Sequence, residues 1–178
     1  MSIHEIVLPE TKPETEWILG RAVQKVSPVY KHALLQGLLF NALHAWADKG
    51  GHGRVGTEWR FRVAPPGQIV RPFVPDVGYL SYATLPADAP EGDVAVPLGA
   101  PTVAVEVLSK DDRRANVEHK IATYLAAGSA AVIVVDPDRQ TITVHDAGAR
   151  VLRAGDVLSH EALPGFSLDV TRLFARMT

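Results

Sequence analysis

Residues 102–136 read TVAVEVLSKDDRRANVEHKIATYLAAGSAAVIVVD, and this stretch decides the fold class. The run at 102–108 is almost wholly apolar and predicts a buried strand. Apolar residues at helical spacing follow, so we expect a helix from about 109 to 127 that ends at a glycine. The run at 130–135 is apolar throughout, which predicts a central strand covered on both faces. A strand, a helix and a second buried strand in succession indicate an α/β domain.

The flanking sequence adds a helix before this stretch and strands on both sides of it. Pro28 suits the first turn of a helix with Ser27 as its N-cap, and the helix is expected to reach about Asp48. Further elements are predicted as strands at 54–63, 77–82, 141–145 and 151–153, a loop at 84–100, and a final helical turn near Leu173. The main elements then follow the order α-β-β-β-α-β-β, a mixed central sheet flanked by helices. Residues 17–26 fit either a short helix or a strand.

Composition sets limits on the organisation of the chain. Its 178 residues favour one domain with a substantial core, and we expect a lead-in at 1–15 followed by a single domain at 16–178. The 18 Lys and Arg residues against 20 Asp and Glu residues give a net charge of -2, so no global positive field attracts nucleic acid. The absence of cysteine excludes disulfide scaffolds and thiolate sites.

Membrane insertion is not expected from this sequence. The longest apolar runs, such as 130–135, are too short to span a bilayer. Residues 1–10 mix charges with apolar residues and contain no hydrophobic core of a signal peptide. We therefore expect a cytoplasmic protein that has no membrane partner.

Two carboxylates inside apolar strand sequence are the strongest chemical signal in the chain. Glu106 lies in the run Val-Ala-Val-Glu-Val-Leu, and Asp76 follows Pro75 and opens the run Asp-Val-Gly-Tyr-Leu. A buried charge is costly unless a cation or several donors meet it. If strand pairing brings the two carboxylates together, they form an oxygen-rich site of the kind that magnesium or manganese prefers.

Three arginines offer an alternative explanation of these two acids. Each acid would then cap a turn or form an ion pair with Arg71, Arg113 or Arg114. Arg113 and Arg114 also stand at the start of the second predicted helix and are candidate phosphate contacts.

The helix after Glu106 carries a lysine on its packing face. At 100° per residue, Lys120 falls between Val117 and Tyr124 on the apolar face. A lysine in such a position is unusual, because lysine is seldom buried without a partner. Either it extends along the apolar surface to solvent, or it reaches the carboxylates, where an ammonium can orient water or stabilise phosphate charge.

These residues together resemble the Uma family of restriction endonucleases, which belongs to the PD-(D/E)XK nuclease superfamily. The resemblance rests on Pro75-Asp76, Val105-Glu106-Val107-Leu108-Ser109, Lys120-x3-Tyr124, Ala127-Gly128, Val134-Val135-Asp136-Pro137 and Leu163-Pro164-Gly165-Phe166. It covers roughly residues 25–175. The family implies a restriction-endonuclease-like core and a magnesium-dependent cut of a phosphodiester. By match, Asp76 and Glu106 would be the metal carboxylates, and the backbone carbonyl of Val107 a further ligand.

One position departs from the superfamily pattern. The pattern places a lysine two residues after the acid on the same strand face, and here that residue is Leu108. Either the lysine role has moved or catalysis is weakened or lost. Lys120 is our choice for the moved lysine, and Lys110 is the alternative.

Four other residues are candidate neighbours of the carboxylates. His32 and Gln36 fall on or beside the apolar side of the first helix, which lies near the carboxylates in the family that the chain resembles. Glu58 sits on the polar face of a predicted strand, and Tyr124 shares the motif of Lys120. We expect these residues to support the site from outside the metal ligands, although a hydrogen-bonded core histidine is the commoner role of a buried imidazole.

The sequence therefore predicts a magnesium- or manganese-dependent hydrolase that cuts DNA, with Asp76, Glu106 and Lys120 as catalytic residues. One alternative is a non-catalytic scaffold of the same fold that binds nucleic acid or a partner protein. Another is a hydrolase of a different phosphate ester. A homodimer would suit the cutting of two strands.

Overall fold

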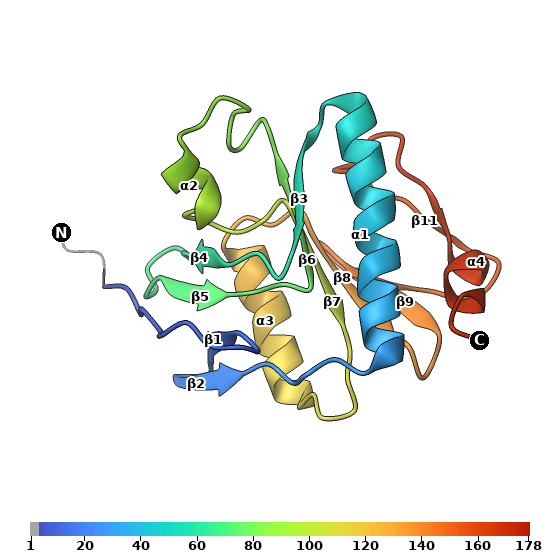
Figure 1. Ribbon diagram of the computed structural model, residues 1–178, viewed down its shortest axis with the longest axis horizontal. Coiled ribbons are helices and arrows are strands. Elements are labelled where there is room, and N and C mark those ends of the chain that lie inside the picture. The colour runs from blue at the N-terminus through green and yellow to red at the C-terminus, as the bar shows by residue number, and fades with distance from the viewer. Residues whose placement is uncertain (1–3) are drawn as a thin grey trace.

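The computed structural model describes residues 4–178 and is built around a six-stranded mixed sheet (Figure 1). Its strands are β3 (Gly53–Thr57), β6 (Val77–Ser81), β7 (Val103–Val107), β8 (Ala131–Asp136), β9 (Thr141–His145) and β10 (Ala149–Leu152). Their order across the sheet is β10-β9-β8-β7-β6-β3. Only β7 and β8 pair in parallel, because the helix α3 (Arg114–Ala126) connects them. The fold is thus the predicted α/β class with a mixed central sheet.

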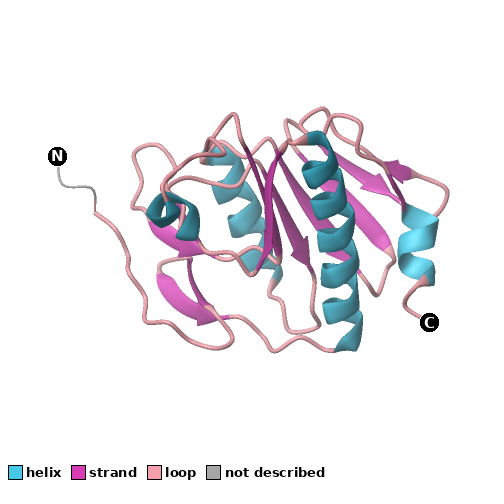
Figure 2. Cartoon of the chain, turned by 45° about the horizontal axis from the view of Figure 1, so that its top comes forward, coloured by secondary structure: helices cyan, strands magenta, loops and turns pink. Residues whose placement is uncertain are grey.

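Helices cover both faces of this sheet (Figures 1 and 2). The long helix α1 (Tyr30–Gly50) buries Leu35, Leu39 and Leu43 at helical spacing against one face. The other face packs on α3 through Tyr124 and Val132. The strand β8 is buried on both faces, as its apolar run predicts, because Ile133 and Val135 pack in the core with α1 and Val132 and Val134 pack in the core with α3.

The C-terminal segment completes the layer beside α1. It contains the paired strands β11 (Val157–Leu158) and β12 (Leu168–Asp169) and the helix α4 (Val170–Ala175). Trp46 of α1 donates a hydrogen bond of 2.8 Å from its indole to the carbonyl of Pro164 in this segment. Phe166, Leu173 and Phe174 join the same core cluster as α1.

Two small strand pairs lie at the other side of the molecule. The hairpin of β1 (Thr15–Ile18) and β2 (Arg21–Gln24) occupies the region that the sequence left open between helix and strand. Beside it, β4 (Phe61–Val63) pairs with β5 (Arg71–Phe73). The hairpin packs close to β5 and α3, which places residues near position 20 next to the chain's central motifs. Of the predicted lead-in, residues 1–3 lie outside the described residues, and Glu5 forms an ion pair with Arg62 at 2.6 Å.

Four local predictions were wrong. The strand predicted at 54–63 is broken into β3 and β4, because Glu58 adopts a positive φ of 49°. Helix α1 begins at Tyr30, and its N-cap is Val29 and not Ser27. The loop at 84–100 contains a short helix, α2 (Glu91–Ala95). Helix α3 begins at Arg114 rather than near 109, because Asp112 Oδ2 accepts the N–H of Ser109 and closes a turn before it.

Candidate functional site

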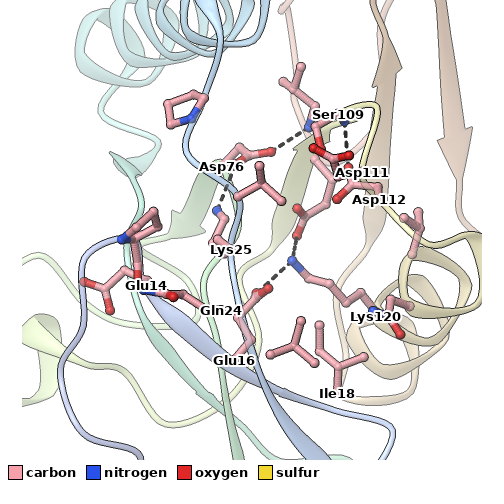
Figure 3. A pocket seen from close by; sticks show the side chains of 18 of the residues that line it. Glu14, Glu16, Ile18, Gln24, Lys25, Asp76, Ser109, Asp111, Asp112 and Lys120 are labelled. Atoms are coloured by element: carbon pink, nitrogen blue, oxygen red, sulfur yellow. Dashed lines mark hydrogen bonds and ion pairs between the residues drawn. The ribbon is translucent and has the colours of Figure 1, made fainter.

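A cavity of about 710 Å³ opens where the hairpin, the start of α1, the strands β6 and β7, and helix α3 meet (Figure 3). Its lining includes the predicted site residues Asp76, Glu106, Val107 and Lys120. The predicted neighbours His32, Gln36 and Glu58 line it too. The fold therefore brings to one place residues that lie up to 88 positions apart in the chain, from His32 to Lys120.

Asp76 stands immediately before β6 and is almost wholly buried. Its Oδ2 accepts a hydrogen bond of 2.7 Å from the backbone N–H of Val107. Its Oδ1 lies 2.8 Å from Lys25 Nζ, and His32 Nε2 lies 3.4 Å from Oδ2. Burial acts to raise the pKa of Asp76, but the charge of Lys25 and the contact with His32 hold that pKa well below its usual range. Asp76 is therefore an ionised carboxylate in the closed interior.

Glu106 lies on β7 and faces α3. Its Oε1 is 2.6 Å from Lys120 Nζ and accepts a hydrogen bond of 3.2 Å from the hydroxyl of Tyr124. Burial raises the pKa of Glu106 to about 7. The positive charge of Lys120 lowers this pKa, but by less than burial raises it. The charges of Asp76 and Glu16 also raise this pKa, which shows that the acids of the cluster repel one another.

Lys120 does not extend to solvent but joins two elements of the site. Besides Glu106, its ammonium lies 2.7 Å from Oε1 of Glu16 on β1. The same oxygen of Glu16 accepts the backbone N–H of Val74 at 2.8 Å. Burial acts to lower the pKa of Lys120, but the two carboxylates raise it above its ordinary value. Lys120 therefore stays charged at neutral pH.

The structure adds Lys25 to the site, and sequence reasoning missed it together with Glu16. The Lys25 ammonium lies 2.8 Å from Asp76 Oδ1, 2.9 Å from Glu58 Oε2 and 2.9 Å from the carbonyl oxygen of Val74 (Figure 3). Burial acts to lower the pKa of Lys25, but the surrounding carboxylates raise it well above its ordinary value. Lys25 lies in the segment 17–26, whose secondary structure the sequence left undetermined, and Glu16 directly precedes that segment.

The ion pairs also decide between the alternatives for the two acids. Asp76 and Glu106 do meet cations, but these are Lys25 and Lys120 and not the arginines named from the sequence. Arg71 makes its side-chain hydrogen bonds to Ile69 and Gln68.

Of four further predicted residues, Gln36 and Arg113 line the cavity, and Lys110 and Arg114 do not. Arg113 lines it, whereas Arg114 is exposed and pairs with Glu118 at 2.7 Å. Lys110 is exposed and lines a separate, smaller hollow. Gln36 donates a hydrogen bond of 3.3 Å to Glu58. Among the predicted residues, Lys110 and Arg114 are thus the two that the fold does not bring to the cluster.

Polar atoms without partners face this region. His32 Nδ1, Ser109 Oγ and Asn116 Oδ1 are buried and have no hydrogen-bond partner among the described residues, and all three side chains belong to the cavity lining. A buried polar atom without a partner is costly. Three residues of the cavity lining therefore keep unused hydrogen-bonding capacity.

The donor chemistry of the cluster fits a hard divalent cation. Four carboxylates, those of Glu16, Glu58, Asp76 and Glu106, share the cavity with the ammonium groups of Lys25 and Lys120. When all six are ionised, two negative charges remain without compensation, and oxygen ligands of this type are those that magnesium and manganese prefer. Within residues 4–178, however, no three or more Asp, Glu, His or Cys side chains are arranged to hold a metal ion. Each ammonium instead joins two of the carboxylates: Lys25 contacts Asp76 and Glu58, and Lys120 contacts Glu106 and Glu16.

A family model described as "Putative restriction endonuclease", that of Uma2, matches residues 4–171. The chain belongs to the Uma2 family. The match spans the hairpin, the cavity and the whole central sheet, so the family relationship covers every residue of the cluster.

A solved structure shares this fold across nearly its whole length. It is described as a "putative nuclease belonging to DUF820" from Anabaena variabilis ATCC 29413. The two chains are 24% identical, with a TM-score of 0.84, over 96% of this chain and 95% of the other. No curated protein matches the chain. Within residues 4–178, no helix is both long enough and apolar enough to cross a membrane.

Proposed function

We propose that this Uma2-family protein is a metal-dependent endonuclease that hydrolyses DNA phosphodiester bonds. The observation that carries the proposal is the convergence of Asp76, Glu106 and Lys120 on one cavity of a family-matched fold. Asp76 and Lys120 are buried and charged, and Glu106 is a buried carboxyl group whose pKa is raised to about 7. Such an arrangement is costly for folding and is typical of functional sites.

Asp76 and Glu106 are the proposed ligands of Mg²⁺ or Mn²⁺, with the backbone carbonyl of Val107 as a third. When bound, the cation supplies a Lewis acid that polarises a phosphoryl oxygen. The hydrogen bond from Val107 N–H to Asp76 supports this assignment, because it fixes the aspartate beside the strand that carries Glu106. His32 restrains the aspartate from α1, and Tyr124 restrains the glutamate from α3.

Lys120 is the proposed counterpart of the lysine that the superfamily places on the strand. Its ammonium contacts Glu106 directly, so it can orient an attacking water or offset the charge that develops on the phosphate. Lys110 is a weaker choice, because it is exposed and does not line the cavity.

The proposed substrate is DNA, bound through individual arginines at the cavity. Arg21 and Arg113 line the mouth of the cavity and can contact backbone phosphates. The net charge of -2 gives no general attraction to nucleic acid, so binding depends on these contacts and on the metal. A homodimer would suit cleavage of both strands, and light scattering measures that state directly.

A second candidate function is a non-catalytic scaffold that binds nucleic acid or a partner protein. Two observations favour it: Leu108 stands at the usual lysine position, and lysines already form ion pairs with the carboxylates Asp76 and Glu106. Such a scaffold would use the ion pairs only to hold its fold.

Nicking of supercoiled plasmid separates the two functions. The endonuclease nicks DNA in Mg²⁺ or Mn²⁺ and loses at least a hundredfold of that rate in Asp76→Asn and in Glu106→Gln, as expected when a transition-state contact is removed. Asp138→Asn, an exposed acid outside the cavity, is the matched control and keeps the wild-type rate. Equal residual nicking in all four proteins would show that a contaminant cuts the DNA. The non-catalytic scaffold would then be the remaining candidate function.

A further inference from the structure

The ammonium of Lys25 is held by oxygens alone. It contacts Asp76 Oδ1 at 2.8 Å, Glu58 Oε2 at 2.9 Å and the carbonyl oxygen of Val74 at 2.9 Å. The Lys25 side chain has a relative solvent exposure of 14%, and the Asp76 side chain has one of 3%. Two carboxylates and a peptide carbonyl around one positive charge form the donor set that hard divalent cations use.

Lys25 and a metal ion at Asp76 compete for the same oxygen. Magnesium binds oxygen at about 2.0–2.1 Å and bears two positive charges. A like charge in contact with the shared carboxylate would repel it strongly, because Coulomb energies at contact distance are large in a partly buried site. A cation that binds in the position of this ammonium, between Asp76 Oδ1 and Glu58 Oε2, therefore requires the ammonium to leave.

The structure provides a path for Lys25 to leave. The residue directly follows β2, and its backbone N–H is anchored to the carbonyl of Glu14 at 2.8 Å. The anchored backbone leaves a long, flexible side chain at the edge of the cavity, which Lys25 itself lines (Figure 3). A rotation of the side chain into that space would break its contact with Asp76 without a change of fold.

We propose that Lys25 is a built-in competitor of the metal ion, which occupies the cation position at Asp76 until the metal displaces it. This inference rests on the proposed metal-dependent function and adds a determinant of metal affinity. Lys120 does not compete for the cation position at Asp76, because it contacts Glu106 and Glu16. The positive charge at position 25 then sets the concentration of metal that the protein requires.

Calorimetric titration with Mn²⁺ tests this role in four proteins: wild type, Lys25→Met, Lys25→Arg and the control Lys12→Met. Lys12 lines the same cavity but forms no ion pair among the described residues. We expect Lys25→Met to bind Mn²⁺ at least about tenfold more tightly than wild type, because a repelling unit charge is removed. Lys25→Arg keeps the charge and the weak affinity, and Lys12→Met changes affinity by less than about threefold.

Two results would overturn the inference, and they are distinguishable. If wild type binds Mn²⁺ and folded Lys25→Met binds it no more tightly, Lys25 does not compete and the proposed function stands. If neither protein binds Mn²⁺, although circular dichroism shows both folded, the proposed function fails and the inference fails with it.

A measurement on the wild-type protein alone covers the case in which Lys25→Met does not fold. Reductive methylation followed by mass spectrometry reports the accessibility of each lysine amine. Saturating Mg²⁺ should speed the modification of Lys25 several-fold and leave that of Lys12 unchanged, because the displaced amine enters the cavity. An equal rate for Lys25 with and without Mg²⁺ would contradict displacement.

Discussion

The backbone N–H of Val107 donates a hydrogen bond of 2.7 Å to Oδ2 of Asp76. This contact ties the acid before β6 to the residue that follows Glu106 on β7, so the two acidic positions are fixed relative to each other. Antiparallel pairing of Val77 with Val105 sets the register that makes the bond. The site is therefore a product of strand register, which a slip by one residue would destroy.

Substitutions of Asp76 separate charge from hydrogen bonding. Asp76→Asn and Asp76→Ala both remove the carboxylate that pairs with Lys25, but only Asp76→Asn keeps an acceptor for the N–H of Val107. We expect both variants to lose cleavage, and Asp76→Ala to lose about 1–3 kcal/mol more unfolding free energy than Asp76→Asn, because it leaves the buried N–H of Val107 without a partner. Urea denaturation measures the difference. Equal stabilities would show that the hydrogen bond from Val107 does not hold the fold.

Replacement of Lys120 tests which lysine serves the reaction. Lys120→Met should lower kcat by about a hundredfold, in the range seen when one charge-stabilising donor is removed. Lys110→Met, on an exposed turn outside the cavity, should retain the wild-type kcat. Single-turnover cleavage at saturating metal gives both rates. A wild-type rate in Lys120→Met, or a large loss in Lys110→Met, would reverse the assignment.

Glu16 should act by positioning Lys120 and not by contact with substrate. Its Oε1 accepts both the Lys120 ammonium and the Val74 N–H. Glu16→Gln keeps an acceptor but removes the charge, so we expect a lower kcat with KM and fold unchanged. A steady-state comparison of kcat and KM checks this. A rise in KM with constant kcat would instead place Glu16 in substrate binding.

Removal of the Tyr124 hydroxyl is a small and specific change to the site. Tyr124→Phe removes only the 3.2 Å hydrogen bond to Glu106 and keeps the ring that packs edge-on against Phe73. The expected loss of unfolding free energy is about 1–2 kcal/mol, since a buried carboxylate loses one donor. Thermal denaturation of the variant and of Tyr82→Phe, a tyrosine outside this cluster, provides the comparison. Equal effects would mean that the bond to Glu106 contributes nothing specific.

The sequence predicts the central part of the fold because its signals there are local. Strands β7 and β8 each correspond to one short apolar run. Helix α3, which lies between them in the chain, shows apolar residues at helical spacing over a few turns. Glu106 and Lys120 were recognisable for the same reason: each is a charge within a locally apolar pattern.

The rest of the site depends on contacts between distant segments. Lys25 meets Asp76 across 51 positions, and the four-residue strands of the hairpin are too short for a periodic pattern to stand out. In β1, Glu16 shares the buried face with Ile18 at strand spacing, but two positions are too few to mark a buried acid in the sequence. The break at Glu58 was equally hidden, because its positive φ interrupts an alternation that continues in the sequence.

The most direct test of the account is calorimetric titration of Mn²⁺ into wild type, Asp76→Asn, Glu106→Gln and the exposed control Asp138→Asn. The account predicts saturable binding in wild type and in Asp138→Asn, and its loss in both cavity variants, because each removes an ionised ligand from the proposed centre. Binding that is the same in all four proteins, or absent from folded wild type, would contradict it.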